Sequence, residues 1–173
     1  MSAATAMFPE PLHAYLAITE LDDAAPFFGE LFRRKFGDPV PDSRHHFGVF
    51  HRDAEQRFSP LAYLHFMPYD ELLLVGGLCT DGRVFERMSE RQREEIRTAG
   101  GVMVHALRYV FVRLADVCEA YFGYCGDPRA YEVDMQAGFV PTPHDKLIAR
   151  WHKPLDAARR DALIAKAHAI GPF

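Results

Sequence analysis

The chain has 173 residues, 49% of them hydrophobic, and a formal net charge of −4 at pH 7. This length suits one core that folds without disulfides or metal, so we expect residues 1–173 to form a single domain. The acidic balance and the scattered arginines exclude a surface built to neutralise a row of phosphates, and nucleic acid is not an expected partner.

The three cysteines, Cys79, Cys118 and Cys125, are odd in number and lack C-x-x-C spacing, which argues against a disulfide framework and a zinc knuckle. The N-terminal stretch "MSAATAMFPEPLHAYL" has no basic start and reaches two prolines before any apolar run long enough for a signal segment. No stretch approaches the ~18 uninterrupted apolar residues of a membrane span. We therefore expect a cytoplasmic protein with reduced thiols and no membrane partner.

The first half of the chain predicts a strand, a helix and an antiparallel meander. Residues 13–19 mix β-formers with small apolar residues and indicate a strand. In the next segment Asp22 and Asp23 favour a helix start, apolar residues recur at helical spacing, and Gly37 supplies a stop. The three strands of the meander are predicted at residues 45–52, 60–69 and 72–80.

The second half alternates helices and strands. Ser89 stands three residues before Gln92, the spacing of a capping box, and predicts a charged helix to Thr98. The run "VMVHALRYVFVRLADV" after Gly100-Gly101 is apolar on most sides and predicts a helix that lies against a sheet. A strand, a helix, a strand and a last helix are predicted at residues 119–126, 127–137, 146–152 and about 155–170. This order predicts an α/β sandwich with a mixed sheet.

The stretch "GDPRAYEVDMQAGFVPT" contains complete signals for one short helix. Asp127 is a favoured N-cap, and Pro128 occupies the first helical position, where its missing N–H costs nothing. Gly138 is placed for the left-handed position after the helix, and Phe139 can close the cap. Local chemistry therefore explains this helix without any function.

The arrangement of strand, helix, Gly-Phe and C-terminal strand resembles the last third of the GNAT acyltransferase superfamily. That family tends to show Asn-x-x-Ala and then a tyrosine four residues before Gly-Phe. Here Asp127 stands for the asparagine, Ala130 matches, and the Gly-Phe pair matches at 138–139. The tyrosine position is Asp134, and Tyr131 lies one turn earlier.

The resemblance in element order extends over about residues 13–153. It implies a GNAT-like α/β fold, with a mixed, mostly antiparallel central sheet flanked by helices. The helix at about 155–170 is an addition to that fold. It offers a surface for covering a sheet edge or for a second copy of the chain in a homodimer.

The resemblance also implies acetyl-CoA or another acyl-CoA as cosubstrate. The family's Gln/Arg-x-x-Gly-x-Gly/Ala motif, which holds the CoA pyrophosphate, is matched most closely by "RTAGGV". Glycines let the main chain approach phosphate oxygens, and a helix N-terminus favours an anion. In this fold the strands "LLLVGGLCT" and "EAYFGYCG" would splay apart around the pantetheine arm. The implied cofactor-binding residues are Arg97, Gly100, Gly101, Val102, Leu78, Cys79 and Asp127.

The implied activity is transfer of an acyl group, most simply acetyl, to the amine of an unidentified small-molecule or peptide acceptor. This chemistry needs a base for the amine proton, an N–H for the oxyanion and an acid for the leaving thiolate. Candidate acids are Tyr131, Tyr124 and Asp134, of which Asp134 could act only if burial raised its pKa. Candidate bases are His65 and Glu71.

A histidine-based metal site is one alternative. His45 and His51 share one face of a strand, His46 points away, and His65 could join from the next strand. No H-x-E-x-H or carboxylate-rich pattern accompanies them, so we assign no metal ligand.

A GNAT-like scaffold without catalysis, used for ligand binding or assembly, is the other alternative. Val102 and Asp134 depart from the family's pattern, and the C-terminal helix is additional. These three features favour the scaffold.

Overall fold

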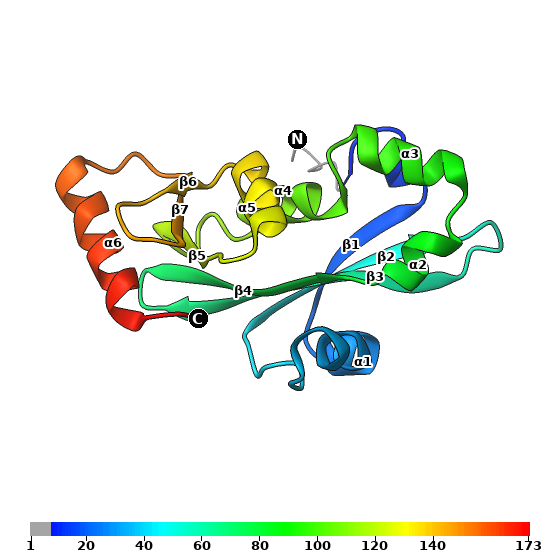
Figure 1. The fold of residues 1–173 in the computed structure, drawn as a ribbon, viewed down its shortest axis with the longest axis horizontal. Coiled ribbons are helices and arrows are strands. Elements are labelled where there is room, and N and C mark those ends of the chain that lie inside the picture. The colour runs from blue at the N-terminus through cyan, green and yellow to red at the C-terminus, as the bar shows by residue number, and fades with distance from the viewer. Residues whose placement is uncertain (1–7) are drawn as a thin grey trace.

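A computed structural model describes residues 8–173 and contains one seven-stranded sheet (Figure 1). The spatial order of the strands is β1-β2-β3-β4-β5-β7-β6, and every neighbouring pair is antiparallel except β4 and β5. The strands are β1 (Leu16–Leu21), β2 (His45–Arg52), β3 (Phe58–Tyr69), β4 (Leu72–Thr80), β5 (Ala120–Tyr124), β6 (Val140–Pro141) and β7 (Leu147–Trp151). The predicted mixed, mostly antiparallel sheet is confirmed.

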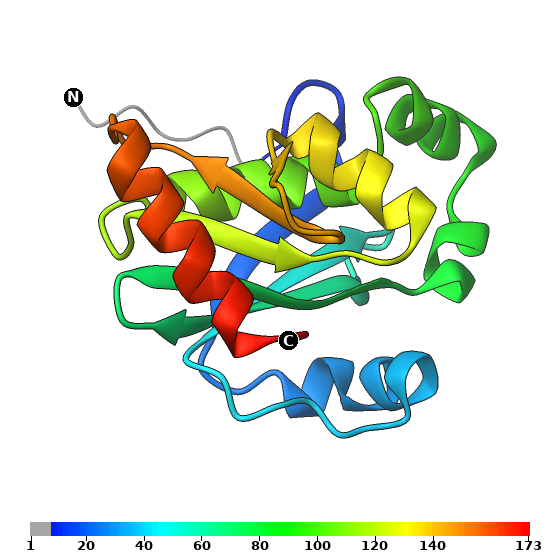
Figure 2. The ribbon, with the colours of Figure 1, turned by 60° about the vertical axis from the view of Figure 1, so that its left-hand side comes forward.

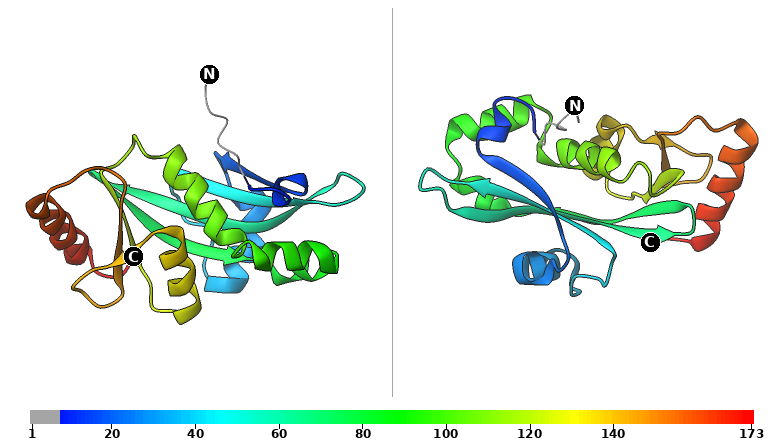
Figure 3. Two further views of the ribbon diagram at one scale, coloured as in Figure 1. Left: turned by 90° about the horizontal axis from the view of Figure 1, so that it is seen from above. Right: turned by 180° about the vertical axis from the view of Figure 1, so that it is seen from behind.

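Helices cover both faces of this sheet (Figures 1 and 2). The helical elements are the 3₁₀ helix η1 (Leu12–Ala14) and the α-helices α1 (Ala25–Phe36), α2 (Gly82–Arg87), α3 (Glu90–Thr98), α4 (Val102–Arg113), α5 (Pro128–Ala137) and α6 (Ala157–Ile170). Helices α4 and α5 lie together on one face, as the view from above shows (Figure 3), and α1 lies on the other. No helix in the described part of the chain is long and apolar enough to cross a membrane.

Successive side chains of β4 point to opposite faces of the sheet and belong to two different hydrophobic clusters. Leu73 and Val75 belong to the main core, together with the apolar face of α4. Leu72 and Leu74 point to the opposite face and pack with α6. A third cluster lies under α1 and includes Tyr63 of β3. Helices α1 and α6 therefore share one face, with the middle of β4 between them.

The predicted helices and strands are present, with shifts at their ends. The first strand begins at Leu16, because η1 occupies the preceding residues. The first long helix begins at Ala25, whose N–H donates to Asp23 Oδ1 at 2.9 Å. The apolar helix ends at Arg113 rather than continuing towards residue 117. Residues 1–7, the start of the stretch expected not to be a signal segment, lie outside the described residues.

Two elements were not predicted. One is α2, whose N-cap Asp81 accepts the N–H of Arg83 at 3.0 Å. The other is β6, a two-residue strand that pairs with β7. The capping box of α3 is confirmed, because Ser89 and Gln92 each bond the other's backbone N–H at 3.2 Å.

Candidate functional site

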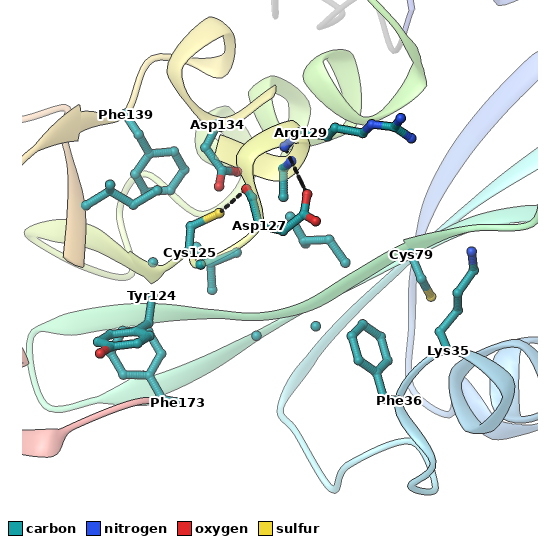
Figure 4. Close-up of a pocket in the computed structure, with 18 of the residues that line it drawn as sticks. Lys35, Phe36, Cys79, Tyr124, Cys125, Asp127, Arg129, Asp134, Phe139 and Phe173 are labelled. Atoms are coloured by element: carbon teal, nitrogen blue, oxygen red, sulfur yellow. Dashed lines mark hydrogen bonds between the residues drawn. The ribbon is translucent and has the colours of Figure 1, made fainter. Parts of the chain in front are cut away.

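The parallel strands β4 and β5 run side by side for four residues and then separate. Their pairing begins at Leu72 with Ala120 and ends at Val75 with Gly123. Beyond Val75, β4 continues to Thr80 without pairing to β5. The space between the separated strands is a cleft of about 760 Å³, walled by the free half of β4, the end of β5, α5 and the end of α1 (Figure 4).

A β-bulge begins where the two strands separate. Between Val75 and Leu78, Gly76 and Gly77 of β4 together oppose His65 of β3. The extra residue bends and twists the strand locally. The His65 imidazole fills the space that a Cβ on Gly76 would occupy. Glycine at 76 and histidine at 65 therefore fit each other, at the point where β4 and β5 separate.

Asp134 of α5 lies in the wall of the cleft beside Cys125 (Figure 4). Only 5% of its surface is exposed, and this burial raises its pKa to about 6, although the neighbouring Cys125 thiol acts in the opposite sense. Asp134 therefore has the raised pKa that a role as an acid requires. Burial also raises the pKa of Cys125 to about 11, so that side chain is a neutral thiol and a poor nucleophile at neutral pH.

The caps of α5 hold Asp134 in this wall. Asp127 Oδ1 accepts the N–H groups of Arg129 at 2.9 Å and Ala130 at 2.8 Å, which confirms the predicted N-cap. At the other end Gly138 adopts a left-handed φ of 110°, and the Phe139 N–H donates to the Asp134 carbonyl at 3.0 Å. Both ends of the helix are thereby fixed.

A second hollow, of about 410 Å³, lies at the N-terminus of α4. It is walled in part by residues predicted to bind the cofactor, namely Arg97, Gly100, Gly101 and Val102. Lys35 and Thr80 border both this hollow and the cleft, so the two spaces meet at the end of β4. The predicted pyrophosphate loop and the predicted pantetheine cleft are therefore neighbours.

The glycine pair before α4 completes a left-handed cap on α3. Gly100 and Gly101 have φ values of 91° and 97°, and their N–H groups donate to the carbonyls of Arg97 and Ile96. No side chain caps the N-terminus of α4 itself, whereas α2, α3, α5 and α6 are each capped by an Asp or Ser. The first amides of α4 are thus available to an anion.

The structure brings some of the other predicted site residues into the cleft. Leu78, Cys79 and Asp127 line it, together with the predicted acid Tyr124. Tyr131 borders an adjoining hollow next to the loop between β6 and β7, and Cys125, Gly126, Asp127 and Ile148 line both spaces. Of the three predicted acids, Tyr124 and Asp134 line the cleft itself.

Neither predicted base lines the cleft. His65 is buried in the bulge, and burial lowers its pKa to about 4, so it is neutral at physiological pH. Glu71 lies at the other end of β4, where it bonds Arg159 at 3.1 Å and Lys166 at 2.8 Å. The Lys166 ammonium holds the pKa of Glu71 below its usual range. Their positions do not support a role in the cleft.

Lys35, Phe36 and Phe173 are among the cleft residues that the sequence-based prediction did not include. Lys35 and Phe36 form the end of α1, where the basic run is explained by the helix dipole alone. Phe173 lies 49 residues beyond Tyr124 in the sequence, yet their ring centroids are 6.2 Å apart. Only the tertiary fold brings these side chains together.

Two of the histidines considered for metal binding, His45 and His46, have other partners. His45 contacts Glu20 Oε1 at 3.2 Å, and His46 bonds the Tyr63 hydroxyl at 2.7 Å. Within residues 8–173 no group of three or more His, Cys, Asp or Glu side chains is arranged to hold a metal ion. The geometry gives the metal alternative no support.

No protein-family model matches the sequence, and no curated protein matches it. Solved structures do match. One is the ribosomal-protein-S18-alanine N-acetyltransferase of Escherichia coli, with a TM-score of 0.50 and 10% identity over 82% of this chain and 97% of that chain. Another is the catalytic domain of a Tetrahymena histone acetyltransferase in complex with coenzyme A, with a TM-score of 0.47 and 15% identity over 82% and 95%.

The chain has the GNAT fold. The likeness covers the mixed sheet and the helices that flank it. At this low identity the likeness concerns the fold, and the function has to be argued from the site.

Proposed function

We propose that the protein is an acyl-CoA-dependent N-acyltransferase, most simply an acetyltransferase. The observation that carries the proposal is the splay of β4 and β5 into a cleft that meets the uncapped, glycine-preceded start of α4. The similar structure from Escherichia coli is an N-acetyltransferase, which supports the same reaction class. The acceptor is an amine.

The two hollows suit the two parts of an acyl-CoA molecule. The free edge of β4 from Gly76 to Thr80 presents backbone groups that a pantetheine amide can pair with, as an added strand would. The amides at the start of α4 suit the pyrophosphate, because a helix N-terminus carries positive partial charge. Arg97 and Lys35 border this second hollow and add full positive charges.

Asp134 fits the role of proton donor. Acyl transfer forms a C–N bond to the amine and breaks the C–S bond of the thioester, and the leaving thiolate takes up a proton. A carboxyl group with a pKa near 6 is protonated in about a tenth of the molecules at pH 7, roughly a hundred times the fraction of an exposed aspartate. Tyr124, on the other wall, is the second candidate for this role.

Acetyl-CoA should raise the melting temperature of the protein. A ligand that binds only the folded state stabilises it by mass action, by about 2.7 kcal/mol at a concentration one hundred times its Kd. Differential scanning fluorimetry with acetyl-CoA, CoA and adenosine as a control will measure the effect. No shift with millimolar acetyl-CoA or CoA would contradict the proposal. Binding of CoA without turnover of any amine would instead assign the scaffold function.

Arg97→Ala should weaken CoA binding about tenfold while leaving the melting temperature unchanged, because the side chain is exposed and its ion pair with Glu94 lies at the surface. Arg91→Ala is the matched control, since it removes an exposed arginine from the same helix outside the hollow. Calorimetric titration with CoA will compare the two. Equal affinities in the two variants would exclude Arg97 from the cofactor site. The glycines are less useful here, since any side chain at their positive φ strains the backbone.

A further inference from the structure

The cleft has a mouth on the face that carries α1 and α6, and aromatic side chains surround it. Phe36 approaches from the end of α1, and Tyr124 and Phe173 approach from β5 and the segment after α6 (Figure 4). We define these three residues as the aromatic mouth. It lies opposite α4 and α5, so an acceptor can enter there while the cofactor occupies the other side.

The two flanks of the aromatic mouth are held in place by packing. The Phe36 ring lies 4.6 Å from the ring of Phe32, a buried residue of the same helix. A Cβ on Gly77 would lie 3.2 Å from Phe36 Cε2, so this ring rests close to the bulged backbone of β4. Tyr124 and Phe173 meet edge to face, with ring planes inclined at 63°. The aromatic surfaces are therefore presented in fixed positions.

Phe36 is 45% exposed despite this packing. Its exposed surface borders the cleft. An apolar group that enters the mouth would bury this surface and gain the favourable contact of one ring with another.

Charge at the aromatic mouth narrows the class of acceptor. Four residues that line the cleft are charged, namely Lys35, Asp127, Arg129 and Asp134. The last three belong to α5 and its N-cap, on the cofactor side. Lys35 is the one charged lining residue supplied by α1, and it is a cation. Among the described lining residues, none on the α1 side of the cleft is a carboxylate that could pair with the additional ammonium groups of a polyamine or a lysine-rich peptide.

We infer that the acceptor is a small monoamine with an aromatic or other flat apolar body. The rings of the aromatic mouth hold that body, and their π faces accommodate the single ammonium before it loses its proton. This inference rests on the proposed acyltransferase function. It names the substrate class and not the reaction.

The test compares acceptors with acetyl-CoA as donor and release of free CoA thiol as the readout. We expect 2-phenylethylamine and tryptamine to react with kcat/KM values at least about tenfold above those of spermidine and a lysine-containing peptide. Phe36→Ala and Phe173→Ala should each raise KM for 2-phenylethylamine about tenfold and leave the Kd for CoA unchanged. Phe27→Ala is the control, because Phe27 is a 51% exposed residue of α1 outside the cleft.

The outcomes separate the inference from the proposed function. Preference for spermidine or the peptide, or an unchanged KM in both mouth variants, would overturn the aromatic monoamine and leave the acyltransferase intact. Failure of the wild-type protein to bind CoA in a calorimetric titration would remove the proposed function, and this inference with it. Folding of each variant is checked by its thermal transition before the kinetics.

Discussion

Asp134→Asn should lower kcat for acyl transfer about a hundredfold and, at pH 8, make the folded protein more stable. The first effect follows from loss of a general acid, which typically contributes a factor of 10² to 10⁴. The second follows from the burial of the carboxylate, which is costly when charged. A residue kept at a cost to stability is what a catalytic role predicts.

The pH range of the stability effect follows from the raised pKa. The unfolded carboxyl titrates near 3.8 and the folded one near 6. The stabilising contribution of protonated Asp134 is therefore fully present below about pH 4 and is lost as pH rises through 6. Above pH 6 the charged, buried form costs up to about 3 kcal/mol, at ~1.4 kcal/mol for each pKa unit. The asparagine side chain of the variant does not ionise, so the variant does not carry this cost.

Urea unfolding at pH 4.5 and pH 8 will measure the difference. We expect Asp134→Asn to exceed the wild type in free energy of unfolding by about 3 kcal/mol at pH 8 and by only about 1 kcal/mol at pH 4.5. Glu132→Gln is the matched control, since Glu132 is an exposed residue of the same helix, and it should change neither stability nor kcat. In the wild type, kcat/KM should also fall as the pH rises through an apparent pKa near 6. A fully active Asp134→Asn variant would reject the proton-donor role and favour Tyr124.

Much of the fold could be predicted because local signals and tertiary packing agree. In α5, Asp127, Pro128 and Gly138 set both ends of the helix through bonds to neighbouring backbone groups. The antiparallel meander was predictable in the same way, from apolar runs separated by turns. The alternation of elements then restricted the topology to a mixed sheet.

The candidate site was only partly predictable, since the relevant distances are tertiary. Nothing in the sequence around Asp134 shows that it is buried, and burial is what changes its chemistry. A role of Asp134 as an acid therefore depended on its burial, which only the structure could reveal. The aromatic mouth shows the same limit, because its rings come from α1, β5 and the chain after α6.

The candidate bases illustrate the converse problem. A histidine on a strand and a glutamate at a hairpin have suitable chemistry as residue types. In the fold His65 fills a bulge, and Glu71 holds α6 to the hairpin through Arg159 and Lys166. Residue type alone does not distinguish a packing role from a catalytic one.

Gly76→Ala should destabilise the protein by about 2 kcal/mol and weaken CoA binding more than tenfold. The new methyl group would occupy the position of the His65 imidazole, and a packed core relieves such a conflict only by shifting side chains or backbone. A shift of the bulged backbone would also move the free half of β4 that walls the cleft.

Gly82→Ala is the matched control, because a Cβ at Gly82 meets no atom within 4 Å and the residue begins α2. It should be neutral, or stabilising by about 0.5 kcal/mol. The double variant Gly76→Ala/His65→Ala should recover part of the lost stability, since the smaller side chain at 65 leaves room for the methyl group. Urea unfolding and CoA titration will be applied to all four proteins. Wild-type stability and affinity in Gly76→Ala would mean that neither the fold nor the cleft depends on the close fit of Gly76 and His65.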